Sequence, residues 1–108
     1  MSEYTPDKWA IVEIRSPSES IYKVMASWYG GYLGSDSWKI SSGIVSVTNT
    51  EDGYEFLNHS GSIYKCHKSA YGMSGYTASI YLNLEKQNNE EIQIRALKQD
   101  EAEGLKFT

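Results

Sequence analysis

Apolar and polar residues alternate along most of this chain, which is the pattern of β-strands rather than of helices. The stretches "VEI" at residues 12–14 and "YEF" at residues 54–56 each place a glutamate between two apolar residues. The stretch "SIYK" follows each of them, at Ser20 and again at Ser62. Because successive side chains of a strand point to opposite faces, each combination predicts two strands joined by a polar turn.

These stretches belong to an internal repeat with an offset of 42 residues. "SIYKVMASWYG" and "SIYKCHKSAYG" are identical at seven of eleven positions, and "SWKI" from residue 37 aligns with "SIYL" from residue 79. Each unit therefore predicts a strand, a polar turn, a strand, a glycine- and aromatic-rich loop and a further strand. The two units cover about residues 9–48 and 51–86.

The alternation also predicts which residues face each other within each unit, with turns at "SPSES" and "NHSGS". The predicted pairs are Ile14 with Tyr22 and Val12 with Val24 in the first unit, and Phe56 with Tyr64 and Tyr54 with Cys66 in the second. This register places apolar residues on one face in both copies. Glu13 and Lys23 then lie on the outer face of the first copy, and Glu55 and Lys65 on that of the second.

The remaining elements are predicted with alternatives. The alternation changes parity after Gly43, which indicates a β-bulge at that glycine. Residues 82–84 and 92–94 flank a short polar loop and would pair as a hairpin, whereas a helix over residues 77–87 is the alternative. The acidic tail "KQDEAEGLKFT" fits a short helix, an edge strand or a disordered segment.

The architecture that follows is all-β, with about seven antiparallel strands in two similar three-stranded units that form a small barrel or sandwich. This architecture can also include one short helix near the C-terminus. A length of 108 residues fits a single domain with one modest core.

Charge and cysteine content narrow the function classes. A formal net charge of −4 argues against a general DNA- or RNA-coating role, because phosphate binding needs clustered basic residues. However, no acidic residue lies between Glu55 and Glu85, and that segment contains Lys65, Lys68 and His67, which predicts a weakly basic surface. The single cysteine excludes an internal disulfide and is typical of a reducing cytoplasm.

Neither a targeting segment nor a membrane span is predicted. The start "MSEYTPDKW" lacks a basic-then-apolar signal pattern. No apolar run approaches the ~18–20 residues that cross a bilayer. We therefore expect a cytoplasmic protein without a membrane partner.

Catalytic and metal-binding signatures are missing. The sequence has no phosphate-binding G-x-x-x-x-G-K-[ST] loop, no H-E-x-x-H and no C-x-x-C, so we expect no cofactor, no metal and no catalytic residue. Cys66 and His67 are neighbours on a predicted strand and so point to opposite faces, which prevents them from acting as a catalytic pair. Cys66 aligns with the inward Val24 and is expected in the core, while His67 is expected on the outer face.

The loops carry the positive signal for function. Tyr, Trp, Ser and Gly, which dominate both loops, are the residue types that binding loops favour. The candidate binding residues are Trp28, Tyr29 and Tyr32 in the first loop, Tyr71 and Tyr76 in the second, and Lys65, His67 and Lys68 on the basic segment before it. For Trp28 and Trp38 a place in the core is favoured over a role as a contact, whereas the four tyrosines can either pack or bind. Asp36 is expected to accept hydrogen bonds from the loop backbone.

The stretches "GGYLGSDSWKISSGI" and "SGSIYKCHKSAYG" resemble segments of small uncharacterised proteins encoded by tailed bacteriophages. The resemblance covers roughly residues 22–72 and consists of aromatic and glycine spacing. It implies expression in a bacterial cytoplasm during infection, where small accessory proteins act by binding a host protein. It carries no established activity and no functional residues.

Two binding functions follow from these features. The first is a non-enzymatic module that engages a protein, either a host factor or a second copy of itself, through the Gly/Tyr/Trp-rich loops. The second is a β-barrel that binds single-stranded nucleic acid. In it Tyr71 and Tyr76 would stack on bases, and Lys65 and Lys68 would meet phosphates. The acidic net charge favours the first.

A third function is a small-molecule binder or an enzyme with its pocket between the two repeats. It requires a cleft that gathers His67, Asp36 or the pseudo-equivalent pair Glu13 and Glu55. Solvated positions on strand faces are the alternative for these carboxylates.

Overall fold

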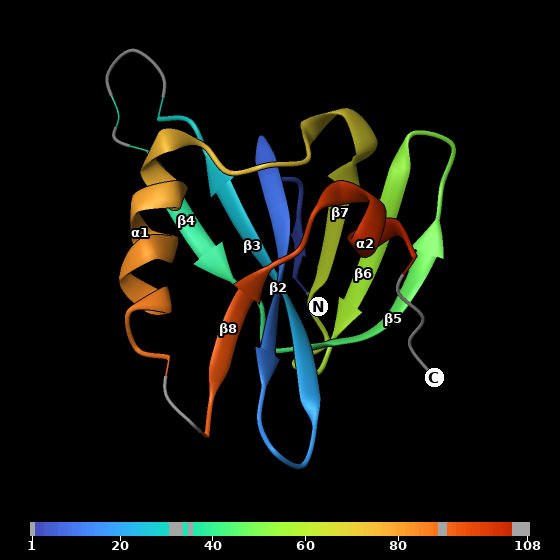
Figure 1. Cartoon of the computed structure of the whole chain (residues 1–108). Coiled ribbons are helices and arrows are strands. Elements are labelled where there is room, and N and C mark those ends of the chain that lie inside the picture. Colours follow the sequence, from blue (N-terminus) through green and yellow to red (C-terminus); the bar gives the residue numbers. More distant parts are fainter. Residues whose placement is uncertain (1, 31–33, 35, 89–90, 105–108) are drawn as a thin grey trace.

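The computed structural model describes residues 2–30, 34, 36–88 and 91–104 of the chain. The strands are β1 (Glu3–Tyr4), β2 (Lys8–Arg15), β3 (Ser20–Trp28), β4 (Ser37–Ile40), β5 (Ile44–Asn49), β6 (Gly53–Asn58), β7 (Ile63–His67) and β8 (Gln93–Ala96). The helices are the short η1 (Lys68–Ala70), α1 (Gly75–Glu85) and α2 (Gln99–Glu103) (Figure 1).

These strands form two four-stranded sheets, in the orders β1-β7-β6-β5 and β4-β3-β2-β8. Every strand pair is antiparallel except β1 with β7, which is parallel. The sheets pack on each other without closing into a barrel in the part of the chain that the structure describes. The predicted all-β sandwich is therefore confirmed, with four strands in each sheet rather than three in each unit.

The core lies between the two sheets. One sheet contributes Trp9, Ile11, Val24 and Ala26, and the other contributes Ile44, Phe56, Tyr64 and Cys66, with Leu97 and Ala102 from the C-terminal segment. Five consecutive residues of β2, from Trp9 to Glu13, are buried. This continuous burial arises because β2 is a central strand whose odd-numbered residues face the core, while α1 packs against β3 and β8 on the other side of the sheet (Figure 1).

The second hairpin has the predicted register, whereas the first is shifted by one residue. Phe56 faces Tyr64 as predicted. In the first hairpin, however, Val24 faces Ile11 instead of Val12, and Tyr22 faces Glu13. The prediction for the first unit is therefore wrong.

The turns explain the shift. Gly61 has a φ of +90°, and the hydrogen bond from Asn58 N–H to Ser62 O spans a loop of residues 59–61. The aligned residue in the first unit is Glu19, and a side chain disfavours positive φ. In the first hairpin, the Ser16 N–H donates to Glu19 O at 2.8 Å and closes a loop of residues 17–18. A three-residue loop and a two-residue loop shift the pairing of the strands by one residue relative to each other. Such a shift moves every side chain of a strand to the opposite face of the sheet.

The third element of the second unit is the helix α1, so the predicted strand and hairpin there are wrong and the alternative helix is confirmed. Ser74 caps α1, because its Oγ accepts a hydrogen bond from Thr77 N–H at 3.2 Å. The Tyr81 hydroxyl donates to Glu85 Oε2 at 2.7 Å, one helical turn on, and accepts from Ala96 N–H at 2.9 Å. Because residues 75–85 are helical, they do not form the predicted hairpin with β8. Strand β8 pairs with β2 instead, where Ile94 faces Ile14.

Two smaller expectations need adjustment. Gly43 has a φ of +146° and lies in the connection by which the chain leaves β4 and enters β5 of the other sheet. The irregularity in the ladder falls just after it, between Ile44 and Ser46. Of the three options for the acidic tail, the short helix is the one found, as α2, and residues 105–108 lie outside the described chain.

Candidate functional site

Three large aromatic side chains are exposed where β3, β4 and α1 come together. Tyr29 follows the last residue of β3, Trp38 is the second residue of β4, and Tyr76 is the second residue of α1. Their exposed fractions are 56%, 38% and 39%. The end of β3 and the starts of β4 and α1 lie together at one corner of the molecule (Figure 1). We call these three residues the aromatic end.

Hydrogen bonds hold the backbone beside these rings. The Tyr29 N–H donates to Asp7 Oδ2 at 2.8 Å, and the Gly30 N–H donates to Asp36 Oδ1 at 3.0 Å. The predicted role of Asp36 in binding the loop backbone is therefore confirmed. Trp28 is half-buried, and its indole Nε1–H donates to Thr5 O at 3.0 Å. The backbone at Tyr29 and Gly30 is thus fixed by Asp7, from before β2, and by Asp36, from just before β4, while Thr5 holds the neighbouring indole.

For Trp38, the structure decides between a role in the core and a role as a contact with a partner. The sequence favours the core for Trp38, and this prediction is wrong: the side chain is exposed because β4 is a four-residue edge strand. Strand phase alone could not reveal this, since Trp38 and Ile40 do share one face of the sheet. The position of β4 at the edge depends on pairing with β3, which is a tertiary property.

Tyr71, in contrast, is a packing residue. Its hydroxyl accepts a hydrogen bond from Ile11 N–H at 3.2 Å and donates one to Leu97 O at 2.7 Å. Its ring meets the Trp9 indole edge-on, with centroids 4.7 Å apart. Burial raises the pKa of the Tyr71 phenol, so the hydroxyl stays protonated. Its partner in the predicted loop surface, Tyr32, lies outside the described residues.

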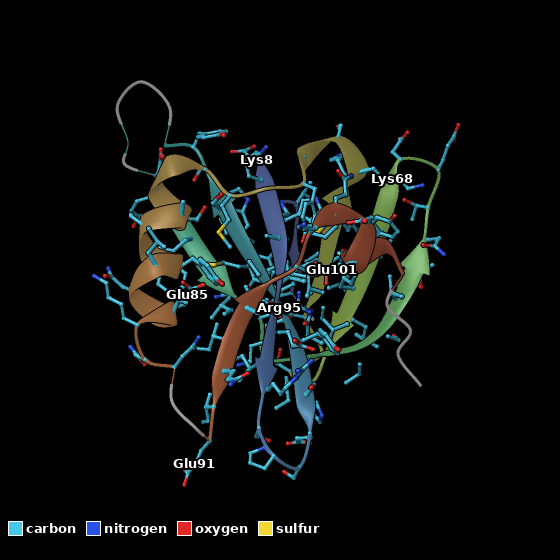
Figure 2. All side chains as sticks on the ribbon, viewed as in Figure 1. Lys8, Lys68, Glu85, Glu91, Arg95 and Glu101 are labelled. Atoms are coloured by element: carbon cyan, nitrogen blue, oxygen red, sulfur yellow. The ribbon has the colours of Figure 1, made fainter. Side chains whose placement is uncertain are left out.

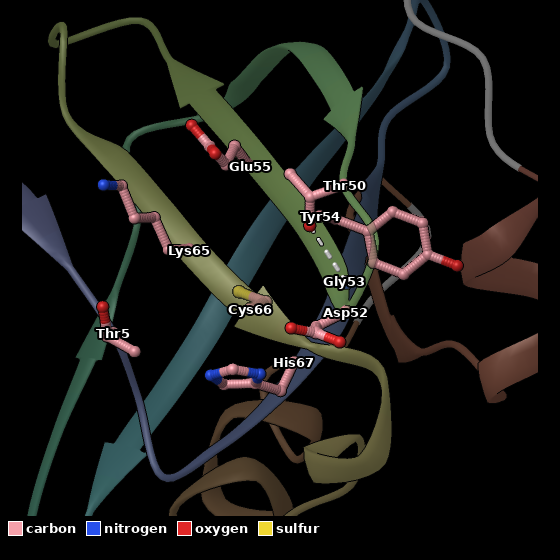
Figure 3. A pocket seen from close by; sticks show the side chains of 9 residues that line it. All are labelled: Thr5, Thr50, Asp52, Gly53, Tyr54, Glu55, Lys65, Cys66 and His67. Atoms are coloured by element: carbon pink, nitrogen blue, oxygen red, sulfur yellow. Dashed lines mark hydrogen bonds between the residues drawn. The ribbon is translucent and has the colours of Figure 1, made fainter.

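The predicted basic surface is neutralised by residues from other strands. Lys65 Nζ lies 2.9 Å from Glu3 Oε1 on β1, and Lys65 faces Glu55 across the β6–β7 ladder. Lys68 Nζ lies over the Tyr54 ring, 5.5 Å from its centroid. The segment lacks acids in sequence, but folding brings acids beside it. Lys65 and His67 do share a shallow pocket of about 240 Å³ with Asp52 and Glu55, so its charges are mixed (Figure 3).

Cys66 is buried and His67 is exposed, as expected for neighbours on a strand that face opposite sides, and both lie at the end of β7 (Figure 3). The Cys66 thiol is buried among apolar side chains, and burial raises its pKa, so the thiolate form needed for reactivity is disfavoured. His67 is exposed, and its backbone carbonyl accepts the Trp9 Nε1–H at 2.6 Å. The prediction of a core cysteine is confirmed, and no group of three His, Cys, Asp or Glu side chains among the placed residues could hold a metal ion.

The carboxylates Glu13 and Glu55 do not come together. The register shift turns Glu13 to the core side of its sheet, where it is 4% exposed, and this corrects its predicted outer-face position. Its carboxylate accepts from the Tyr22 hydroxyl at 2.9 Å and lies 3.4 Å from Arg95 Nε and from Arg15 Nη2. Burial and the hydrogen bond to Glu13 raise the pKa of Tyr22.

This cluster continues outward to α2. Arg95 Nη1 binds Glu101 Oε2 at 2.8 Å, and the two side chains lie at the junction of β8 and α2 (Figure 2). The arrangement joins the sheet to the C-terminal helix and has the form of a structural ion-pair network. The pocket expected between the two repeats is filled by the core residues that both sheets contribute.

The fold and the exposed residues define a small two-sheet β protein with a helix on one face and an aromatic end. Comparison of the chain with family models, with curated proteins and with solved structures found no match. Neither α1 nor α2 has the length and apolar composition that a helix needs to cross a bilayer.

Proposed function

We propose that this chain is a small non-enzymatic binding module that engages a protein partner through the aromatic end, Tyr29, Trp38 and Tyr76. The observation that carries the proposal is the exposure of three large rings, from three different elements, at one corner of the fold. Tyr and Trp are the residues most often found as energetic anchors in interfaces. They offer large contact areas at a small cost in conformational entropy.

The scaffold supports this role. Asp7 and Asp36 hold the backbone of residues 29–30, so part of the ordering cost of binding is met before the partner arrives. Trp28 and Tyr71, which the sequence also offered as contacts, have structural hydrogen bonds instead, to Thr5 O and Leu97 O. The resemblance to small phage proteins makes a cytoplasmic host protein of the bacterium the first partner to test. A second copy of the chain is the next.

Single-stranded nucleic acid is the second candidate, and one observation favours it. Lys8 and Lys68 lie toward the same end of the molecule as the starts of β4 and α1 (Figure 2). Aromatic rings beside lysines are the usual elements of a single-strand binding surface. The net charge of −4 and the pairing of Lys65 with Glu3 weigh against it.

The test compares two triple variants. Tyr29→Ala/Trp38→Ala/Tyr76→Ala removes the aromatic end, and Ile21→Ala/Val45→Ala/Leu57→Ala removes three apolar side chains of similar exposure elsewhere. Immobilised wild-type protein captures partners from bacterial lysate with and without nuclease treatment, and the affinity of the purified partner is then measured for all three forms.

We expect the aromatic variant to bind at least about tenfold more weakly and the control variant to bind like wild type. Equal affinity of the folded aromatic variant and wild type would refute the proposal. Retention that disappears with nuclease, together with a steep loss of affinity with salt, would establish the nucleic-acid candidate instead.

A further inference from the structure

A second concave surface lies on the other face of β4 from Trp38. It has a volume of about 470 Å³ and is bounded by β1, β3, β4, β7, the β4–β5 connection and the β6–β7 turn. The lining side chains that matter here are Tyr4, Lys23, Lys39, Ser42, Ser60 and Tyr64. We call this surface the lysine cleft. None of its lining residues is acidic, in contrast to the mixed pocket beside Lys65.

Lys23 and Lys39 both line the cleft, although the strand register places Lys39 on the inner face of its sheet, with Ala26, and Lys23 on the outer face, with Val12. Within the described ranges, no carboxylate oxygen lies within 4 Å of Lys23 Nζ or Lys39 Nζ, whereas Lys65 and Arg95 both have one. Lys39 Nζ lies 5.2 Å from the centroid of the Tyr4 ring, and this cation–π contact holds it on the inner side of β4. In a protein of net charge −4, the cleft is a local concentration of positive charge.

A tyrosine from β7 also lines the cleft. Tyr64 as a whole is only 1% exposed, and it belongs to the core on one side and to the lining of the cleft on the other. Burial raises the pKa of Tyr64 to about 12, which keeps the hydroxyl protonated and available as a donor.

The floor of the cleft is rigid and rich in hydroxyls. The Ser60 N–H donates to Ser42 Oγ at 3.0 Å, and the His59 N–H donates to Gly43 O at 2.8 Å. These bonds tie the β6–β7 turn to the β4–β5 connection. Ser60 Oγ lies 3.0 Å from Ser62 Oγ, so the two hydroxyls share one hydrogen bond and leave one O–H free to donate.

We propose that the lysine cleft binds a small organic anion, with its phosphate or carboxylate group at Lys39, with the hydroxyls of Tyr64 and Ser60 as further donors, and with Lys23, which also lines the cleft, as a second cation. Ammonium and hydroxyl groups are the side chains with which proteins bind phosphate and carboxylate oxygens. The volume lies in the range of small-molecule sites and leaves room for an organic part beside the charged group. This site is separate from the aromatic end, so a negative result for one of the two proposed surfaces leaves the proposal for the other unaffected.

Two variants and a matched control test the site. Lys23→Gln/Lys39→Gln removes both charges and keeps most of the side-chain length. Tyr64→Phe removes one hydroxyl and keeps the ring in the core. Lys65→Gln removes a lysine from the opposite face of the neighbouring sheet and is the control. Amide chemical shifts of each protein are followed during titration with inorganic phosphate, ribose 5-phosphate and citrate at constant ionic strength, with sodium chloride as reference.

We expect saturable shifts at Ser42 and Ser60 with at least one of these anions, but not with chloride. The double lysine variant should lose at least tenfold in affinity and Tyr64→Phe about threefold or more, whereas the control should match wild type. Preference for ribose 5-phosphate identifies a phosphate ligand, and preference for citrate a carboxylate. The proposal is overturned by shifts that never saturate, by equal shifts with chloride, or by full binding in the double variant. Much tighter binding of a single-stranded polythymidine at the same residues also overturns it, in favour of nucleic acid.

Discussion

The Tyr71 hydroxyl donates a 2.7 Å hydrogen bond to the carbonyl oxygen of Leu97. This contact joins the segment before α1 to the segment that leads into α2, across 26 residues of sequence. The same hydroxyl accepts the Ile11 N–H of the central strand. One side chain thus connects three parts of the chain, and four predictions follow from this and related contacts.

Replacing Tyr71→Phe removes both hydrogen bonds and keeps the ring against Trp9. The Ile11 N–H and Leu97 carbonyl are then left without this partner in a buried setting, so we expect a loss of about 1–3 kcal/mol in the free energy of unfolding. Urea denaturation measures the loss. Tyr29→Phe, at an exposed ring, is the control and should change stability by less than about 0.5 kcal/mol. Equal stability of Tyr71→Phe and wild type would show that the hydroxyl does not support the fold.

Replacing Gly61→Ala tests the turn that sets the register of the second hairpin. An added Cβ at Gly61 meets no atom within 4 Å, so the cost comes only from its φ of +90° and should be about 1–2 kcal/mol. Gly75 also has free space around its Cβ but lies in α1 without positive φ. Gly75→Ala should therefore be neutral or stabilise by up to about 1 kcal/mol. Thermal unfolding of both variants decides the matter, and destabilisation of the two by the same amount would contradict this account.

Replacing Glu13→Ala leaves the Tyr22 hydroxyl and Arg95 without their shared acceptor. We expect a loss of about 1–3 kcal/mol, because Glu13 is buried and hydrogen-bonded. Glu55, which aligns with Glu13 in the repeat, faces outward beside Lys65, and Glu55→Ala should cost less than about 0.5 kcal/mol. Chemical denaturation of the two variants provides the comparison. Similar losses at both positions would mean that the register shift has no energetic consequence.

Alkaline pH should destabilise the protein. Burial raises the pKa of Cys66 above its ordinary value of 9.0 and that of Tyr64 from 10.0 to about 12. A group whose pKa is raised by folding binds its proton more tightly in the folded state. Its contribution is complete below the unfolded pKa and is lost as pH rises above it.

The free energy of unfolding should therefore fall from about pH 9 upward, by as much as about 1.4 kcal/mol per pH unit for each group that titrates only in the unfolded state. Denaturation between pH 7 and 11 measures this slope. Cys66→Ala should be less stable at pH 7 but show a shallower slope between about pH 9 and 10. An unchanged slope in that variant would exclude the thiol as its source.

Several features could be predicted because local chemistry decides them. The period-two pattern of "YEF" and "IYKCH" specifies the second hairpin, and Gly61 supplies the one conformation that its turn needs. The inward position of Cys66 followed from the same alternation. For residues 75–85, period-two and helical patterns coexist. The Ser74 cap and the docking of Tyr81 on Ala96 favour the helix, and only the second of these is a contact distant in sequence.

By itself, the sequence determined a small mostly-β domain, a buried cysteine and the register of one hairpin, because alternation and turn residues act over a few neighbours. Tertiary structure alone decided which side chains remain available to a partner. Glu3 forms an ion pair with Lys65, the Leu97 carbonyl accepts a hydrogen bond from the Tyr71 hydroxyl, and the edge position of β4 exposes Trp38. Lys39, Ser60 and Tyr64 line one cleft because the chain crosses between the two sheets after β4. Each of these outcomes depends on which distant strand lies alongside, and no short stretch of sequence contains that information.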